Sequence, residues 1–93
     1  TEPFAGITAW NPRHERPTPA RNEAANRELD ADLAALGLCV LPAAGFDPRR
    51  THVEPSFAVF GISIEDALEL ARCYRQAAIV WWDGERATVA WVR

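Results

Sequence analysis

Hydrophobic and polar residues alternate along the chain in segments that predict five strands and two helices. Apolar runs rich in strand-forming residues predict strands over residues 4–10, 38–41, 56–62, 77–82 and 86–92. Two longer segments, 19–36 and 64–76, repeat their apolar residues every three or four positions, which is the period of a helix with one buried face. The order strand, helix, strand, strand, helix, strand, strand predicts an α+β fold, a ferredoxin-like sandwich with an added C-terminal strand.

Start and stop signals accompany these segments. Thr18 before Pro19 is a typical N-cap with proline in the first turn, and Ser63 is positioned to cap the second helix. Gly37 would end the first helix. The second strand stops at Pro42 or continues weakly to Phe46, and a long connection over 47–55 follows it. Asp83-Gly84 predicts a two-residue hairpin turn before the last strand.

Each predicted helix carries an apolar stripe that should face the core of the fold. In the first helix the stripe comprises Ala25, Leu29, Leu33 and Leu36. In the second helix it comprises Ile64, Ala67, Leu68, Ala71 and Tyr74.

The predicted topology gathers three connections at one end of the sheet, which we call the upper end. These are 11–18, 46–55 and the turn at Arg75–Gln76, and the first helix also begins there with its free N–H groups. Loops held by a rigid scaffold often carry function, so we expect any binding site at this end. The candidate ligand-binding residues are Asn11, Arg21, Asn22, Arg49, Glu54, Ser56 and Gln76.

These polar residues allow two interpretations. The amides and the Glu54 carboxylate together could recognise a purine or another hydrogen-bonding ligand, or the same side chains could simply cap loops and element ends. Likewise Arg21 and Arg49 could clamp an anion, or pair with neighbouring carboxylates. Glu54 is the best candidate for a catalytic acid or base, in the alternative that the protein is a small enzyme acting on an anionic or nucleotide-like substrate.

The tryptophans indicate a second surface. Trp81 and Trp82 are adjacent in a predicted strand, so they point to opposite faces of the sheet. One should pack under the helices, while the other joins Val80, Val89 and Trp91 on a face that no helix covers. An apolar face of this size predicts a partner, and we expect a homodimer through the Trp-rich C-terminal sheet.

Composition narrows the function classes. The 93 residues suffice for one domain, 1–93, with a formal charge of −3 and no Lys among its ten basic residues. Lysine Schiff-base and P-loop chemistry are therefore excluded, and the negative charge argues against nucleic acid as a partner. The longest apolar run has six residues, too short to span a membrane, and the first residues do not resemble a leader peptide. No His, Cys, Asp or Glu spacing matches a metal motif, so we expect neither a metal nor another cofactor.

The two cysteines, Cys39 and Cys73, lie far apart in apolar patterns. This placement predicts two buried free thiols in a reducing cytoplasm.

Several short motifs together resemble a family of small bacterial proteins known only as a domain of unknown function. They are Ile7-Thr-Ala-Trp-Asn-Pro12, Glu54-Pro-Ser56-Phe, Gly61-Ile62 and Gln76-x-Ala78, with Arg21-Asn22 at the helix start and Asp47-Pro48 in the middle loop. The resemblance implies a bacterial, cytoplasmic, stand-alone domain and implies no reaction. We therefore expect a binding or interaction module whose upper-end loops contact a small polar ligand or a protein partner.

Overall fold

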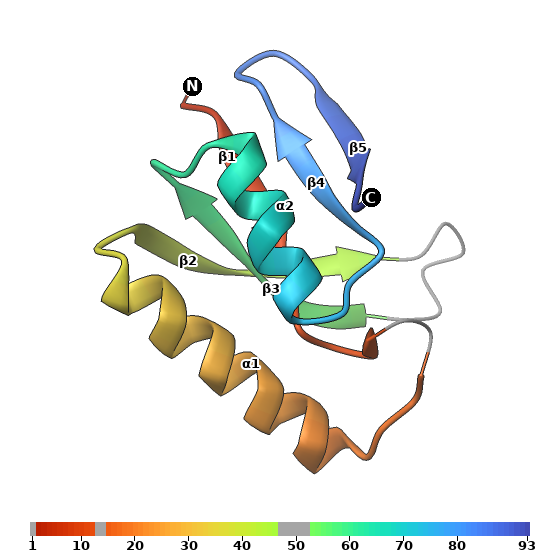
Figure 1. Ribbon diagram of the computed structural model, residues 1–93. Coiled ribbons are helices and arrows are strands. Elements are labelled where there is room, and N and C mark those ends of the chain that lie inside the picture. The colour runs from red at the N-terminus through yellow and green to blue at the C-terminus, as the bar shows by residue number, and fades with distance from the viewer. Residues whose placement is uncertain (1, 13–14, 47–52) are drawn as a thin grey trace.

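The computed structural model describes residues 2–12, 15–46 and 53–93. It contains five strands and two helices in the predicted order (Figure 1). These are β1 (Phe4–Ile7), α1 (Pro19–Ala35), β2 (Cys39–Phe46), β3 (Val53–Phe60), α2 (Ile64–Cys73), β4 (Ala78–Trp82) and β5 (Ala87–Trp91). The α+β class predicted from the sequence is confirmed.

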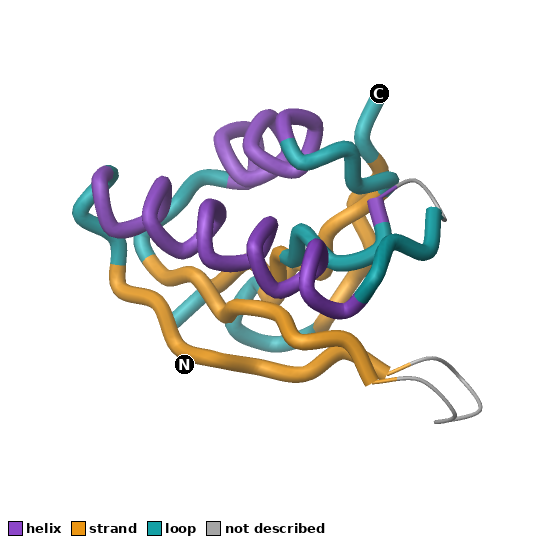
Figure 2. Tube along the Cα trace, turned by 90° about the horizontal axis from the view of Figure 1, so that it is seen from below, coloured by secondary structure: helices purple, strands orange, loops and turns teal. Residues whose placement is uncertain are grey.

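The five strands form one antiparallel sheet in the order β2-β3-β1-β4-β5. Both helices lie on the same side of this sheet (Figure 2). Helix α1 contacts β2 and β3, whereas α2 contacts β4 and β1. The opposite side of the sheet carries no helix in the described part of the chain, and we call it the open face.

The core lies between the helices and the covered face of the sheet. Ile7 and Val59 from the central strands and Leu29 and Leu33 from α1 are its largest fully buried side chains. Helix α2 contributes the small residues Ala67 and Ala71, both fully buried, which let its axis approach the sheet closely. Trp81 packs against this core, as predicted for one tryptophan of the adjacent pair.

The predicted helix caps are confirmed. The Thr18 hydroxyl accepts a hydrogen bond from the Arg21 backbone N–H at 3.2 Å, and Ser63 accepts one from Asp66 N–H at 3.1 Å. Gly37 follows α1 with a φ of +72°, a conformation that side chains rarely adopt. Helix α2 ends at Cys73, three residues before the predicted end, and Arg75 follows with a φ of +58°.

Strand β2 continues through Pro42 to Phe46, the longer of the two extents that the sequence left open, because an edge strand tolerates the missing N–H of proline. Other expectations from the sequence are corrected. Residues 53–55 belong to β3 and not to the preceding connection, because they pair with β2. The hairpin after β4 places Gly84 and Glu85 between the bonded pair Asp83–Arg86, one residue later than predicted.

Two further corrections concern burial. Leu36 is 62% exposed because it is the C-cap of α1 and lies beyond the helix's contact with the sheet. Both thiols are free, as predicted, but both are exposed. Cys39 lies on the edge strand β2 and Cys73 is the last residue of α2. No described helix combines the length and apolar character needed to cross a membrane.

Candidate functional site

The upper end is organised by buried amide side chains on α1. Asn26 is 7% exposed, and its Oδ1 accepts a hydrogen bond from Ala9 N–H at 2.8 Å. Its Nδ2 donates to the carbonyl of Pro55 in β3 at 2.9 Å, and the Thr8 hydroxyl donates to the same carbonyl at 2.7 Å. One asparagine therefore ties α1 to the segment after β1 and to the start of β3.

A second amide pair lies one helical turn earlier. The Asn22 side chain is 3% exposed; its Oδ1 accepts from Asn11 N–H at 3.0 Å, and its Nδ2 donates to Asn11 Oδ1 at 2.8 Å. This reciprocal pairing holds Asn11 at a φ of +46°. Gln76, after α2, donates from Nε2 to the Trp10 carbonyl at 3.2 Å. We call Asn11, Asn22, Asn26 and Gln76 the amide cluster.

Three of the predicted site residues belong to the amide cluster, and their hydrogen bonds agree with the interpretation that they cap loops and element ends. Asn11, Asn22 and Gln76 do meet at the upper end, as the topology predicted, but they bond to one another and to the backbone. Among the described residues, no buried side-chain nitrogen or oxygen is left without a hydrogen-bond partner. Asn26, which completes the cluster, was not among the predicted residues, although its position on the apolar stripe of α1 was a signal for burial.

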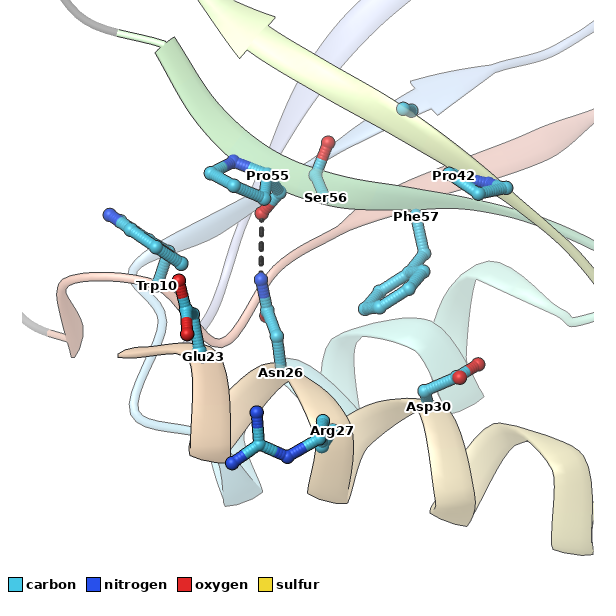
Figure 3. Close-up of a pocket in the computed structure, with 10 residues that line it drawn as sticks. Trp10, Glu23, Asn26, Arg27, Asp30, Pro42, Pro55, Ser56 and Phe57 are labelled. Carbon is cyan, nitrogen blue, oxygen red and sulfur yellow. Dashed lines mark hydrogen bonds between the residues drawn. The ribbon is translucent and has the colours of Figure 1, made fainter. Parts of the chain in front are cut away.

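A groove of about 330 Å³ lies between α1 and the β2–β3 hairpin (Figure 3). The bond from Asn26 to Pro55 crosses it, with Trp10 and Glu23 on one side and Phe57 and Asp30 on the other. Its walls are mostly apolar, and its charged groups all come from α1. These charged groups are Glu23, Arg27 and Asp30.

A second depression, of about 420 Å³, lies on the open face of the sheet. Its floor is low because small residues occupy the central strands: Gly6, Ala58 and Ala78. A Cβ at Gly6 would lie 3.3 Å from the Cβ of Val80, so this glycine keeps the floor open. Two predicted site residues, Glu54 and Ser56, line the depression from β3, and both are half-buried.

The rest of the open face is apolar. Strand alternation and register place Leu41, Val80, Val89 and Trp91 on this side, and these residues are 53%, 45%, 56% and 66% exposed. Toward the lower end, Phe4 lies between Phe60 and Trp82. The centroid of its ring is 5.4 Å from that of Phe60 and 6.4 Å from that of Trp82. The predicted apolar patch of Val80, Trp82, Val89 and Trp91 on the uncovered side is thus present.

The described arginines do not gather around one point at the upper end. Arg21 lies exposed in the first turn of α1, and its backbone N–H is bonded to Thr18. Arg49 lies outside the described residues. Arg75, which was not a candidate for an anion clamp, forms an ion pair with Glu15 at 2.5 Å and joins the end of α2 to the segment before α1. Within 2–12, 15–46 and 53–93, no group of three or more His, Cys, Asp and Glu is arranged to hold a metal.

Among the described residues, Tyr74 and Asp83 have shifted pKa values, and these two lie outside the groove and the depression. Burial, followed by a hydrogen bond to Asp32, raises the pKa of Tyr74 well above its usual value; the Tyr74 hydroxyl donates to Asp32 at 2.5 Å and links α2 to α1. The backbone N–H groups of Arg86 and Glu85 lower the pKa of Asp83 in the β4–β5 turn. Both groups form hydrogen bonds within the chain.

Comparison with known proteins agrees with the resemblance in the motifs. The model of a family described as a protein of unknown function (DUF3293) matches residues 7–79, and the chain belongs to this family. No curated protein and no solved structure matches the chain. The matched region runs from the end of β1 to the second residue of β4, so β5 lies outside it.

Proposed function

We propose that this domain is a non-catalytic binding module and that the open face of its sheet is the binding surface. The observation that carries the proposal is the depression of about 420 Å³ over Gly6, Ala58 and Ala78, with Glu54 and Ser56 at its upper end. Binding sites for small molecules commonly combine a largely apolar cavity with a few polar groups that fix orientation. This depression has both parts.

The chemistry of the lining favours one class of ligand. An apolar floor accepts a flat apolar body, and the Glu54 carboxylate and Ser56 hydroxyl accept hydrogen bonds at one end. A ligand with a planar ring and N–H donors on one edge, such as a nucleobase, meets both requirements. The amide cluster takes no direct part in this proposal, because its hydrogen bonds support the upper end from behind.

The proposal includes the arrangement of the fold and the setting of the protein. The strand order β2-β3-β1-β4 is the one that two interleaved strand-helix-strand units give in a ferredoxin-like sandwich, and β5 extends it at one edge. A bacterial, cytoplasmic origin is supported by the family resemblance and by two exposed thiols that remain unpaired. We also propose a homodimer, supported by the apolar residues exposed on the C-terminal strands.

Thermal denaturation against a panel of nucleobases, nucleosides, nucleotides and phosphorylated metabolites tests the binding function. A ligand that binds only the folded state raises the midpoint, by about 4–8 °C for each kcal/mol in a domain of this size. We expect one ring-containing class to raise the midpoint of the wild type. Absence of a shift with every compound would contradict the small-molecule proposal.

Three variants locate the site. Glu54→Gln should weaken the shift by removing charge, and Ala58→Leu should abolish it by filling the floor. Asp30→Asn alters only the α1 groove and should keep the full shift, since Asp30 does not line the depression. The reverse pattern would transfer the site to the groove. Consumption of a bound compound, lost in Glu54→Gln, would favour the alternative of a small enzyme with Glu54 as its acid or base.

A further inference from the structure

Strand β5 forms an edge of the sheet that nothing in the described structure covers. It pairs only with β4, so its other side offers backbone donors and acceptors to solvent (Figure 1). Natural sheets protect such edges with charged residues, proline or bulges. The sequence of β5, Ala-Thr-Val-Ala-Trp, contains none of these residues, whereas the opposite edge strand β2 contains Pro42.

The hydrogen-bond pattern tells which residues of β5 present their backbone outward. Asp83 N–H donates to Arg86 O at 3.2 Å at one end of the β4–β5 ladder, and Val92 N–H donates to Ala77 O at 2.8 Å at the other. In an antiparallel ladder, bonded and non-bonded pairs alternate, so the even-numbered residues of β5 direct their N–H and C=O groups to β4. The odd-numbered residues direct theirs to the free edge: Ala87, Val89 and Trp91.

We propose that β5 pairs antiparallel with β5 of a second copy of this chain, with Val89 on the twofold axis. In this register Val89 pairs with the partner's Val89, and Ala87 and Trp91 pair with each other across the axis. All three outward residues then form hydrogen-bonded pairs within the strands, with two bonds in each pair. A shift by two residues in either direction leaves only two such pairs between the strands.

Side-chain size supports the same register. Trp91, the most exposed of the large apolar residues at 66%, comes to lie opposite the partner's Ala87, where a small side chain leaves room for the indole. Within each chain, Trp82 already lies opposite Ala87 on the same face. Large and small residues therefore alternate across the joined strands, and valines meet at the axis.

Charged residues beyond the ends of β5 also support the register with Val89 on the axis. Beyond the strand ends, the same register brings Glu85, in the β4–β5 turn, near the partner's Arg93, and the twofold symmetry repeats this approach at the other end. Both residues are exposed within one chain. The apolar centre is thus flanked by complementary charges, which is the typical anatomy of a protein interface.

Pairing of the two β5 strands would join the five-stranded sheets of both copies into one continuous sheet, with the two open faces on the same side. This inference rests on the proposed homodimer and names its contact as edge to edge, not face to face.

Sedimentation velocity over a wide concentration range tests the pairing with two matched variants. Val89→Lys and Leu41→Lys each place a charge on an apolar residue of the open face with similar exposure, 56% and 53%, but at opposite edges of the sheet. We expect the wild type to sediment at twice its chain mass of 10.3 kDa. Val89→Lys should remain a monomer, and Leu41→Lys should dimerise like the wild type.

The other outcomes separate the two proposals. Dissociation by both lysine variants would keep the homodimer but overturn edge pairing in favour of a face-to-face contact. A wild type that stays monomeric at every concentration would overturn the homodimer itself. Circular dichroism confirms that each variant is folded.

A charge reversal then tests the register without altering the strand. Glu85→Arg should weaken dimerisation at least several-fold by opposing like charges at both ends. Adding Arg93→Glu should restore it, since the pair is then reversed and complementary. Failure of the second change to restore dimerisation would overturn the register with Val89 on the axis. If Val89→Lys does not fold, the outcome of this pair decides the proposal.

Discussion

The amide cluster places polar side chains inside the fold, whereas the open face places apolar side chains on its surface. The two regions differ in whether these side chains have suitable contacts within the chain. Two members of the amide cluster, Asn22 and Asn26, are buried, and both find hydrogen bonds within the chain. Apolar side chains are exposed on the open face, and Val89 and Trp91 are more than half accessible. Burial of a polar group costs little free energy when the group is hydrogen-bonded, whereas exposure of an apolar group to water is unfavourable.

This difference indicates where the protein has capacity to bind. Polar residues gather at the upper end, which is why the sequence predicts a site there. Asn11, Asn22 and Gln76, however, form hydrogen bonds that connect segments of the fold. The exposed apolar side chains of the open face lie outside the core of the fold. Burial of these apolar side chains against another molecule would contribute favourable free energy, which supports the proposal that the open face is the binding surface.

Removal of the Asn26 amide should have the largest effect on stability. Asn26→Ala leaves the buried N–H of Ala9 without its acceptor and takes one donor from Pro55 O. We expect a loss of about 2–4 kcal/mol in the free energy of unfolding, measured by urea denaturation. Arg27→Ala, the exposed neighbour on α1, is the control and should change stability by no more than about 0.5 kcal/mol. Equal effects of the two substitutions would mean that the cluster does not stabilise the fold.

The two faces of the sheet can be compared with one substitution. Val59 on the covered face is fully buried, and Val80 on the open face is 45% exposed. Val→Thr preserves shape but adds a hydroxyl, so Val59→Thr should cost about 1–3 kcal/mol and Val80→Thr about 0.5 kcal/mol or less. Thermal denaturation of both variants at a concentration that keeps the chain monomeric checks this. A large loss at Val80 would show that the open face is part of the core.

The smallest expected effect concerns the link between the helices. Tyr74→Phe removes the hydroxyl that donates to Asp32 and should cost about 0.5–1 kcal/mol at neutral pH. Because burial and Asp32 raise the pKa of folded Tyr74, the folded state favours the neutral phenol. Its contribution is complete below about pH 10, where an unfolded tyrosine ionises, and is lost as the pH rises above that value.

Urea denaturation from neutral to strongly alkaline pH measures this contribution. The wild-type and Tyr74→Phe curves should converge as the pH passes about 10. Curves that stay parallel over this range would contradict a raised pKa at Tyr74.

Local signals predicted much of the fold. The caps at Thr18 and Ser63 mark the helix starts because a side-chain oxygen next to the first turn is a short-range feature. The placement of Trp81 and Trp82 on opposite sides of the sheet follows from strand alternation alone, whereas the structure shows that Trp81 is the one that packs against the core. The errors lie where contacts are distant: Leu36 continues the apolar stripe of α1, but no strand reaches it.

The candidate site was harder to predict. Glu54 and Ser56 lie near a predicted loop, and both line the open-face depression. Ser56 is in the predicted strand, whereas Glu54 reaches the sheet because β3 begins earlier than expected. Asn26 appeared as one more polar residue near the helix start. Its role depends on Pro55, 29 positions away in the chain, which no local pattern indicates.

The sequence by itself therefore determined the elements, their order and the side of each strand on which a residue lies, because these properties depend on neighbours within a few positions. Only the tertiary structure decided which polar residues are already bonded and which apolar residues remain exposed. Those properties depend on pairs such as Gln76 and Trp10, 66 positions apart. A hydrogen bond or an apolar contact is satisfied by proximity in space, and the sheet brings distant segments together in a way that periodicity does not encode.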